Sequence, residues 1–182
     1  MNIKIEKHKH HIVILDDNYH ILRSYIAELE CLGIEVSVTS NISDFNKLLS
    51  KNKKIDLFII DVMLPSDGFF STIATDHGTI TGLLVGKEIR YAGIETPIIF
   101  FSVAWLKNHI EDIKDTKNNL RNSIYLRKHE ILPHELGEII LAILEKGKMT
   151  SKLGKSYQKI IDSLTLNPNF CGFGIDLKKL FK

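Results

Sequence analysis

Five short apolar runs, rich in β-branched and aromatic residues, alternate along the chain with segments of helical periodicity. Runs of this length and content are typical of strands, whereas helices repeat apolar residues every three or four positions. The runs cover residues 12–15, 34–38, 55–60, 97–101 and 123–126. Because they are mostly apolar, they indicate a parallel sheet that helices cover on both faces. The sequence therefore predicts a (βα)5 doubly wound domain over residues 10–147.

The spacing of apolar residues places helices between these runs. Gly33 suits the position after the first helix, Pro133 suits the first turn of the last one, and a weaker helix is expected over 105–113. The expected buried faces consist of Ile21, Leu22, Tyr25, Ile26, Leu29 and Leu32; of Phe45, Leu48 and Leu49; of Leu83, Leu84 and Ile89; and of Leu136, Ile139, Ile140, Ile143 and Leu144. Cys31, near the end of the first helix, is expected in the core.

Length and composition exclude several classes of protein. The 182 residues have room for one domain and an appendage, and 44% hydrophobic with 25% charged residues can bury a core. The longest stretch without a charged residue, 163–175, has 13 residues and is too short for a membrane span. The N-terminus has no apolar signal segment, and two cysteines make no disulfide framework. We therefore expect a cytoplasmic protein.

The charge is distributed unevenly. The net charge is +2, yet residues 1–145 carry −4 and residues 146–182 carry +6. Nucleic-acid binding is thus not expected of the main domain. The last segment, 148–182, predicts a short C-terminal helical extension with apolar residues at helical spacing. It is too short to build its own core and should pack on the domain, a second copy or a partner.

Polar side chains stand where four of the expected strands end. Asp16 and Asp17 follow the first strand, Asp61 the third, Ser102 the fourth and Lys128 the fifth. In doubly wound sheets these ends form one ligand-binding rim. Clustered carboxylates repel by about 4 kcal/mol at roughly 4 Å and an effective dielectric near 20. A magnesium ion, which prefers oxygen ligands, would resolve this repulsion.

This rim predicts a phosphoryl-transfer site. Asp61 would be the nucleophile and would form an aspartyl phosphate, while Asp16 and Asp17 hold the magnesium ion. Lys128 and Ser102 would bind the phosphoryl oxygens.

The chain resembles the receiver domain of two-component response regulators. The matching elements are Asp16-Asp17, Asp61-Val62-Met63-Leu64-Pro65, Gly82 followed by Arg90, Ser102, and Tyr125-Leu126-Arg127-Lys128. The resemblance implies a flavodoxin-like fold and the phosphoacceptor Asp61. It also implies that the Met63 carbonyl is a further magnesium ligand and that Tyr125 turns inward when Ser102 moves onto the phosphoryl group.

The resemblance further implies a phosphorelay switch rather than a turnover enzyme. The donor would be a phosphohistidine of a histidine kinase or phosphotransfer protein, and the output would be a protein contact on the face formed by the fourth and fifth helices and the fifth strand. Homodimerisation, the donor, the signal and the output partner stay open at this point.

Three features depart from the family pattern. Residues 66–81 form a long insertion, for which partner recognition and a merely tolerated loop both stay open; its Asp67, Asp76 and His77 are expected to be solvated. His129 replaces the usual proline after Lys128, so the loop that carries the lysine need not bring its ammonium group close to Asp61. Val103 is expected to narrow access to the phosphoryl group, and neither Met63 nor Ala104 offers a side chain that could orient an attacking water.

These departures leave one alternative open, a pseudo-receiver that serves as an interaction scaffold and no longer switches. Two other readings are disfavoured. A phosphohydrolase of the haloacid dehalogenase type needs an acid where Met63 stands, and a flavin site needs a phosphate-binding loop where Asp16-Asp17-Asn18 stands.

Overall fold

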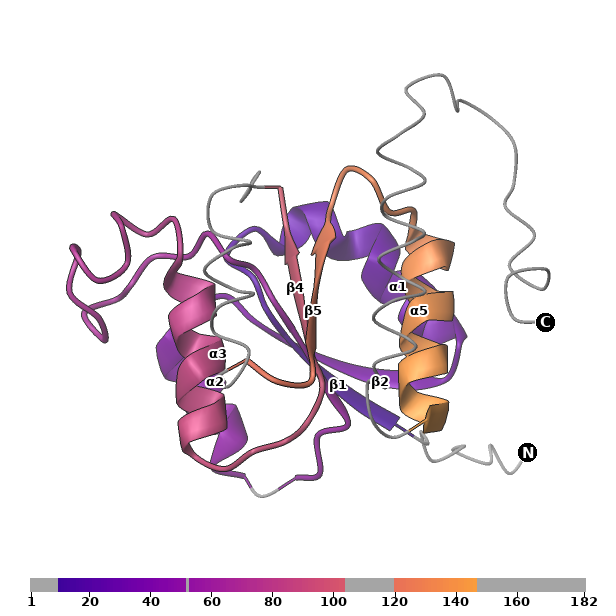
Figure 1. Cartoon of the computed structure of the whole chain (residues 1–182). Coiled ribbons are helices and arrows are strands. Elements are labelled where there is room, and N and C mark those ends of the chain that lie inside the picture. The colour runs from indigo at the N-terminus through magenta and orange to yellow at the C-terminus, as the bar shows by residue number, and fades with distance from the viewer. Residues whose placement is uncertain (1–9, 52, 104–119, 147–182) are drawn as a thin grey trace, which may run out of the picture. The chain divides into compact units, whose positions relative to one another are not determined.

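The computed structural model describes residues 10–51, 53–103 and 120–146 (Figure 1). The helix expected over 105–113 and the extension expected over 148–182 lie outside the described residues. Within the described part of the chain, no helix is both long enough and apolar enough to cross a membrane.

The core of the fold is a five-stranded sheet in which all neighbouring strands run parallel, in the order β2-β1-β3-β4-β5. The strands are β1 (His10–Leu15), β2 (Ile34–Thr39), β3 (Leu57–Ile60), β4 (Ile98–Ser102) and β5 (Ser123–Arg127). Each coincides with an expected apolar run, and every residue of β3 and β4 is buried. The winding reverses between β1 and β3, which places the binding crevice beyond their carboxyl ends.

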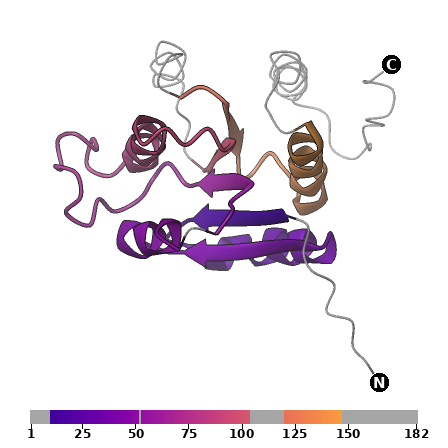
Figure 2. The ribbon, with the colours of Figure 1, turned by 90° about the horizontal axis from the view of Figure 1, so that it is seen from below.

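The helices cover both faces of the sheet. They are the 3-10 helix η1 (Tyr19–Leu22) and the α-helices α1 (Arg23–Cys31), α2 (Ile42–Leu49), α3 (Thr81–Tyr91) and α5 (Pro133–Lys146). Figures 1 and 2 show α1 beside α5 on one face and α2 with α3 on the other; Figure 2 views the same ribbon from below. The doubly wound (βα)5 prediction is confirmed.

Local sequence signals explain the helix ends. Gly33, directly after α1, has φ +74°, a conformation that glycine adopts without strain. Asn41 caps α2, since its side chain accepts a hydrogen bond from the Asp44 amide at 2.8 Å. The expectation for Cys31 was wrong: it is exposed, because it lies about 200° around α1 from the buried Leu29.

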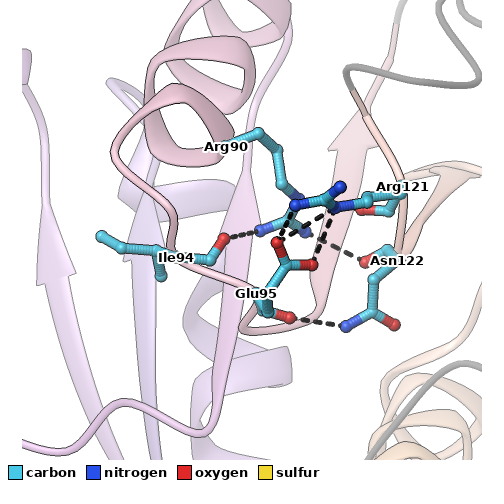
Figure 3. A network of polar contacts seen from close by, with 5 residues as sticks. All are labelled: Arg90, Ile94, Glu95, Arg121 and Asn122. Atoms are coloured by element: carbon cyan, nitrogen blue, oxygen red, sulfur yellow. Dashed lines mark hydrogen bonds and ion pairs between the residues drawn. The ribbon is translucent and has the colours of Figure 1, made fainter.

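A buried arginine joins the end of α3 to the start of β5 (Figure 3). Arg90 is 6% exposed and donates hydrogen bonds to three carbonyls, those of Arg121 (2.8 Å), Ile94 (2.6 Å) and Asn122 (3.2 Å). Glu95 pairs with the exposed Arg121 guanidinium, and its carbonyl accepts a bond from the Asn122 side chain. This geometry of one guanidinium with three acceptors fixes where β5 begins relative to α3.

Replacing Arg90 by methionine tests this junction. Arg90→Met removes the guanidinium donor from the Arg121 and Ile94 carbonyls and leaves the Asn122 carbonyl with the Ile98 amide, so we expect a loss of about 2 kcal/mol in the free energy of unfolding. Chemical denaturation measures the loss. Arg121→Gln is the control, because it keeps the backbone carbonyl and removes an exposed ion pair, which contributes little. Equal losses in the two variants would contradict the role assigned to Arg90.

Candidate functional site

Three aspartates converge at the carboxyl edge of the sheet. Asp16 and Asp17 follow β1, Asp61 follows β3, and these two strands are neighbours in register. One carboxylate oxygen from each lies within 4.8 Å of the others. Asp16 and Asp61 are buried and Asp17 is exposed. Across residues 10–51, 53–103 and 120–146, no other group of three potential metal-ligating side chains lies so close together.

Backbone amides orient the two buried carboxylates. The Asn18 amide donates to Asp16 Oδ1 at 3.0 Å, and the Met63 amide donates to Asp61 Oδ1 at 3.1 Å. Both contacts are of the Asx type, in which the side chain binds the amide two residues ahead. The second oxygen of each carboxylate therefore faces the same space between β1 and β3.

Lys128 fills part of that space. Its Nζ atom lies 2.6 Å from Asp16 Oδ2 and 2.6 Å from Asp61 Oδ2, and the residue is only 5% exposed. Its backbone amide donates to the Ser102 carbonyl at 3.0 Å. The described residues contain no cis peptide bond, so the ordinary trans link to His129 is sufficient for the lysine to reach both aspartates.

The charges of the site are strongly coupled. Burial raises the pKa of Asp16, against the hydrogen bond and positive charge of Lys128. Burial also acts against the charged form of Lys128, but the two carboxylates outweigh it and raise the pKa of the ammonium group. Lys128 thus stays protonated. One ammonium among three carboxylates still leaves an uncompensated negative charge at this edge.

This donor set fits a hard divalent cation. All three aspartates offer oxygen ligands, and the carboxylates exceed the buried ammonium in charge. Magnesium binds such oxygen sets, usually with few protein ligands and several waters. Asp16, Asp17 and Asp61 can therefore hold magnesium; the Met63 carbonyl is the further ligand that the sequence suggested.

Ser102 lies on β4, the strand next to β3, and Tyr125 lies on β5, the strand beyond it. Ser102 ends β4, is fully buried and pairs in register with Arg127, the residue before Lys128. Tyr125 of β5 is partly buried against the apolar core, and this burial raises the pKa of its phenol to about 12. The phenol is therefore uncharged at neutral pH.

The 66–81 segment lies next to this rim and leads into α3 (Figure 1). Asp67, Asp76 and His77 are exposed, as expected of solvated loop residues. Of the two phenylalanines, Phe69 is exposed but Phe70 packs against the core. Sequence patterns gave no sign of this difference.

Gly82 is the point at which α3 meets the backbone that follows β3. A Cβ atom on Gly82 would lie 1.9 Å from the Asp61 carbonyl oxygen and 2.9 Å from Val62 Cα. Its amide donates to the Val62 carbonyl at 3.0 Å. Only glycine allows this approach of helix and strand, which explains the glycine of the motif.

One contact to the site was missed from the sequence. Tyr25 of α1, expected merely to fill the core, points its hydroxyl at the Lys128 carbonyl (2.9 Å) and the Ile131 carbonyl (2.7 Å). It therefore supports the loop that carries Lys128. No signal in the sequence marks it, because a tyrosine on an apolar helix face usually serves packing.

The sequence of this chain resembles that of a curated protein. No family model matches the chain. A curated relative, described as the probable transcriptional regulator ycf27 of Cyanidium caldarium, is 29% identical over 159 residues, which are 86% of this chain and 55% of that protein. The chain thus spans about half the length of this relative.

Solved receiver structures share the architecture. The Francisella response regulator 1452 receiver domain is 22% identical, with a TM-score of 0.54, over 75% of this chain and 97% of that one. A CheY-like receiver from Methanospirillum hungatei is 22% identical, with a TM-score of 0.57, over 76% and 95%. A receiver of an HD domain-containing protein from Pseudomonas fluorescens is 18% identical, with a TM-score of 0.58, over 81% and 95%.

The chain has the fold of response regulator receiver domains. The resemblance inferred from its motifs is confirmed, and so is the flavodoxin-like fold. In this fold, the three aspartates and Lys128 lie at the edge of the sheet where the motifs placed them.

The ion pairs of Lys128 can be tested by substitution. In metal-free protein, Lys128→Met leaves two buried carboxylates without their counter-ion, and we expect a loss of about 3 kcal/mol in unfolding free energy. Adding Asp16→Asn should recover part of the loss, because one of those charges is removed. Denaturant unfolding of the single and double variants measures the coupling.

Lys47→Met is the matched control, since Lys47 forms an ion pair with Asp44 in which both side chains are exposed, and its loss should change stability little. Strict additivity of Lys128→Met and Asp16→Asn would show that the two side chains are not coupled.

Proposed function

We propose that this receiver domain is a phosphoryl-accepting signalling switch, with magnesium-dependent transfer from a phosphohistidine donor to Asp61. The observation that supports the proposal most is the convergence of three carboxylates within 4.8 Å, two of them bridged by the Lys128 ammonium. The donor is a histidine kinase or phosphotransfer protein, and the output is a protein contact, for which a homodimer is one form. The proposal places the protein in the cytoplasm.

In the proposed transfer, a carboxylate oxygen of Asp61 attacks the phosphorus, the phosphorus–nitrogen bond to the donor histidine breaks, and the imidazole takes up a proton. The product is an acyl phosphate on Asp61. Magnesium, held by Asp16, Asp17, Asp61 and the Met63 carbonyl, would neutralise charge on the phosphoryl oxygens. Because the chain keeps the phosphoryl group, it is not an enzyme in the turnover sense.

Lys128 and Ser102 would receive the phosphoryl oxygens. Lys128 already donates to Asp61 and can transfer this hydrogen bond to a phosphoryl oxygen, which stabilises the charge that forms there. Ser102 ends the neighbouring strand, so a shift of its hydroxyl toward the phosphoryl group would empty space that Tyr125 can enter. This rearrangement would alter the surface around β5 and α5 that an output partner reads.

The domain boundaries belong to the same proposal. Residues 10–147 would form the receiver, with 66–81 as an insertion, and residues 148–182 a C-terminal extension. The regulator named in the comparison is about twice as long, so its role in transcription is not transferred to this chain. With a net charge of −4 over residues 1–145, we do not expect the receiver to bind nucleic acid.

Magnesium uptake and phosphoryl acceptance test the proposal directly. We expect magnesium to stabilise the wild type, by about 2.7 kcal/mol at a hundredfold excess over Kd, and Asp17→Asn to lose this gain. A small phosphoryl donor with magnesium should add one phosphoryl group to the wild type and none to Asp61→Asn, as mass spectrometry of the intact protein shows. Asp67→Asn, an exposed acid outside the cluster, should behave as the wild type.

A second measurement separates the switch from the pseudo-receiver scaffold. Beryllium fluoride with magnesium should shift the amide spectrum around Asp61, Ser102 and Lys128. An unmoved spectrum, together with no magnesium uptake, would favour the scaffold.

We also predict that the acyl phosphate is long-lived. Met63 and Val103 are both exposed at the rim and have no hydrogen-bonding group to orient a water molecule; Ala104 lies outside the described residues. Met63→Asn should shorten the lifetime several-fold by supplying such a group, whereas Met63→Leu should leave it unchanged. A phosphate-release assay with magnesium measures both, and a wild-type half-life on the order of seconds would contradict the prediction.

A further inference from the structure

We propose that Thr75, in the middle of the 66–81 segment, is a positioning residue for the metal-binding loop that follows β3. The inference rests on the proposed function, because it concerns the Met63 carbonyl as a magnesium ligand. The 66–81 segment would then support the metal-binding site directly.

Thr75 is an exception within its segment. The side chains around it are mostly exposed, with Ile73 at 90%, whereas Thr75 is 1% exposed. Its Oγ1 lies 3.1 Å from the Thr72 carbonyl and 3.3 Å from the Ser71 carbonyl, to which it donates, and it accepts a hydrogen bond at 3.2 Å from the Gly78 amide, which also donates to the Thr75 carbonyl at 3.1 Å. One buried hydroxyl thus holds both sides of a turn.

The turn that Thr75 holds rests against the loop after Asp61. The Gly78 carbonyl accepts a hydrogen bond from the Leu64 amide at 3.2 Å. Gly78 has φ +94°, and a Cβ atom on it would lie 3.2 Å from the Leu64 carbonyl oxygen. Gly78 therefore lies directly on the backbone of Leu64, whose own side chain is buried.

Met63 lies between two such backbone anchors. On one side the Val62 carbonyl accepts from the Gly82 amide, and on the other the Leu64 amide donates to Gly78. The Met63 amide itself donates to Asp61 Oδ1. With both neighbours fixed, the direction of the Met63 carbonyl depends on the anchor that Thr75 maintains.

A hydroxyl is the group that this position requires. The oxygen accepts from one amide and donates to a carbonyl in the same turn, and serine could do the same, whereas valine has the shape of threonine and can do neither. Groups that orient metal ligands from behind typically change metal affinity by 10- to 100-fold when they are lost. Because Thr75 acts through Gly78 and Leu64, we expect a change at the lower end, about tenfold.

The test compares Thr75→Val with Thr75→Ser and with Thr79→Val in the full chain. Thr79 is the matched control, since its hydroxyl donates to the carbonyl and the carboxylate of Asp76, away from the Gly78 amide. Amide hydrogen exchange in metal-free protein measures how well the Leu64 amide is protected. Calorimetric titration with magnesium alone measures the affinity of the site for the ion. Thr75→Val should speed exchange at the Leu64 amide and weaken magnesium binding about tenfold.

Thr75→Ser should restore both readouts, and Thr79→Val should leave both at the wild-type level. Wild-type magnesium affinity and Leu64 exchange in Thr75→Val would overturn the positioning role. A wild type that takes up no magnesium would instead overturn the proposed function. If Thr75→Val does not fold, Gly78→Ala disturbs the same contact from the other side and should give the same two changes.

Discussion

The Lys128 ammonium between two buried carboxylates is the interaction on which the edge of this sheet depends. It joins the end of β5 to the ends of β3 and β1, which lie two and three positions away in the sheet. Desolvation makes each of these charges costly alone, so the three groups stabilise one another only in this arrangement. Any change that displaces β5, β1 or β3 therefore changes the electrostatics of the site at once.

Helix α3 fixes this arrangement from both of its ends. At its start, Gly82 lies against the backbone of Asp61, and at its end Arg90 holds the residues that lead into β5. The strand that Arg90 positions carries Tyr125 and leads to Lys128. Asp61 and its ammonium partner Lys128 are thus both positioned by one helix, although 67 residues separate them along the chain.

The sequence predicts the sheet and the acidic residues at its edge. It does not predict the side chains that hold the surrounding loops in place. Apolar runs predict buried parallel strands, and parallel strands bring their carboxyl ends together, so Asp16 and Asp61 could be placed side by side. Tyr25 and Thr75 could not, because the hydrogen bonds of one uncharged side chain leave no periodic pattern, whether they are long-range as in Tyr25 or local as in Thr75. Cys31 and Phe70 show the same limit: which side of an element is covered depends on tertiary packing.

The charge of the site also decides how a phosphoryl group can be kept there. Three carboxylates and one ammonium already leave excess negative charge, and a phosphoryl group on Asp61 replaces one carboxylate charge by about −2. Lys128 cannot offset this increase, since it is already shared with Asp16. Retention of the phosphoryl group must therefore depend on a divalent cation more strongly than the unmodified site does. Under the proposed function, the Met63 carbonyl and the segment proposed to position it would therefore matter most after transfer.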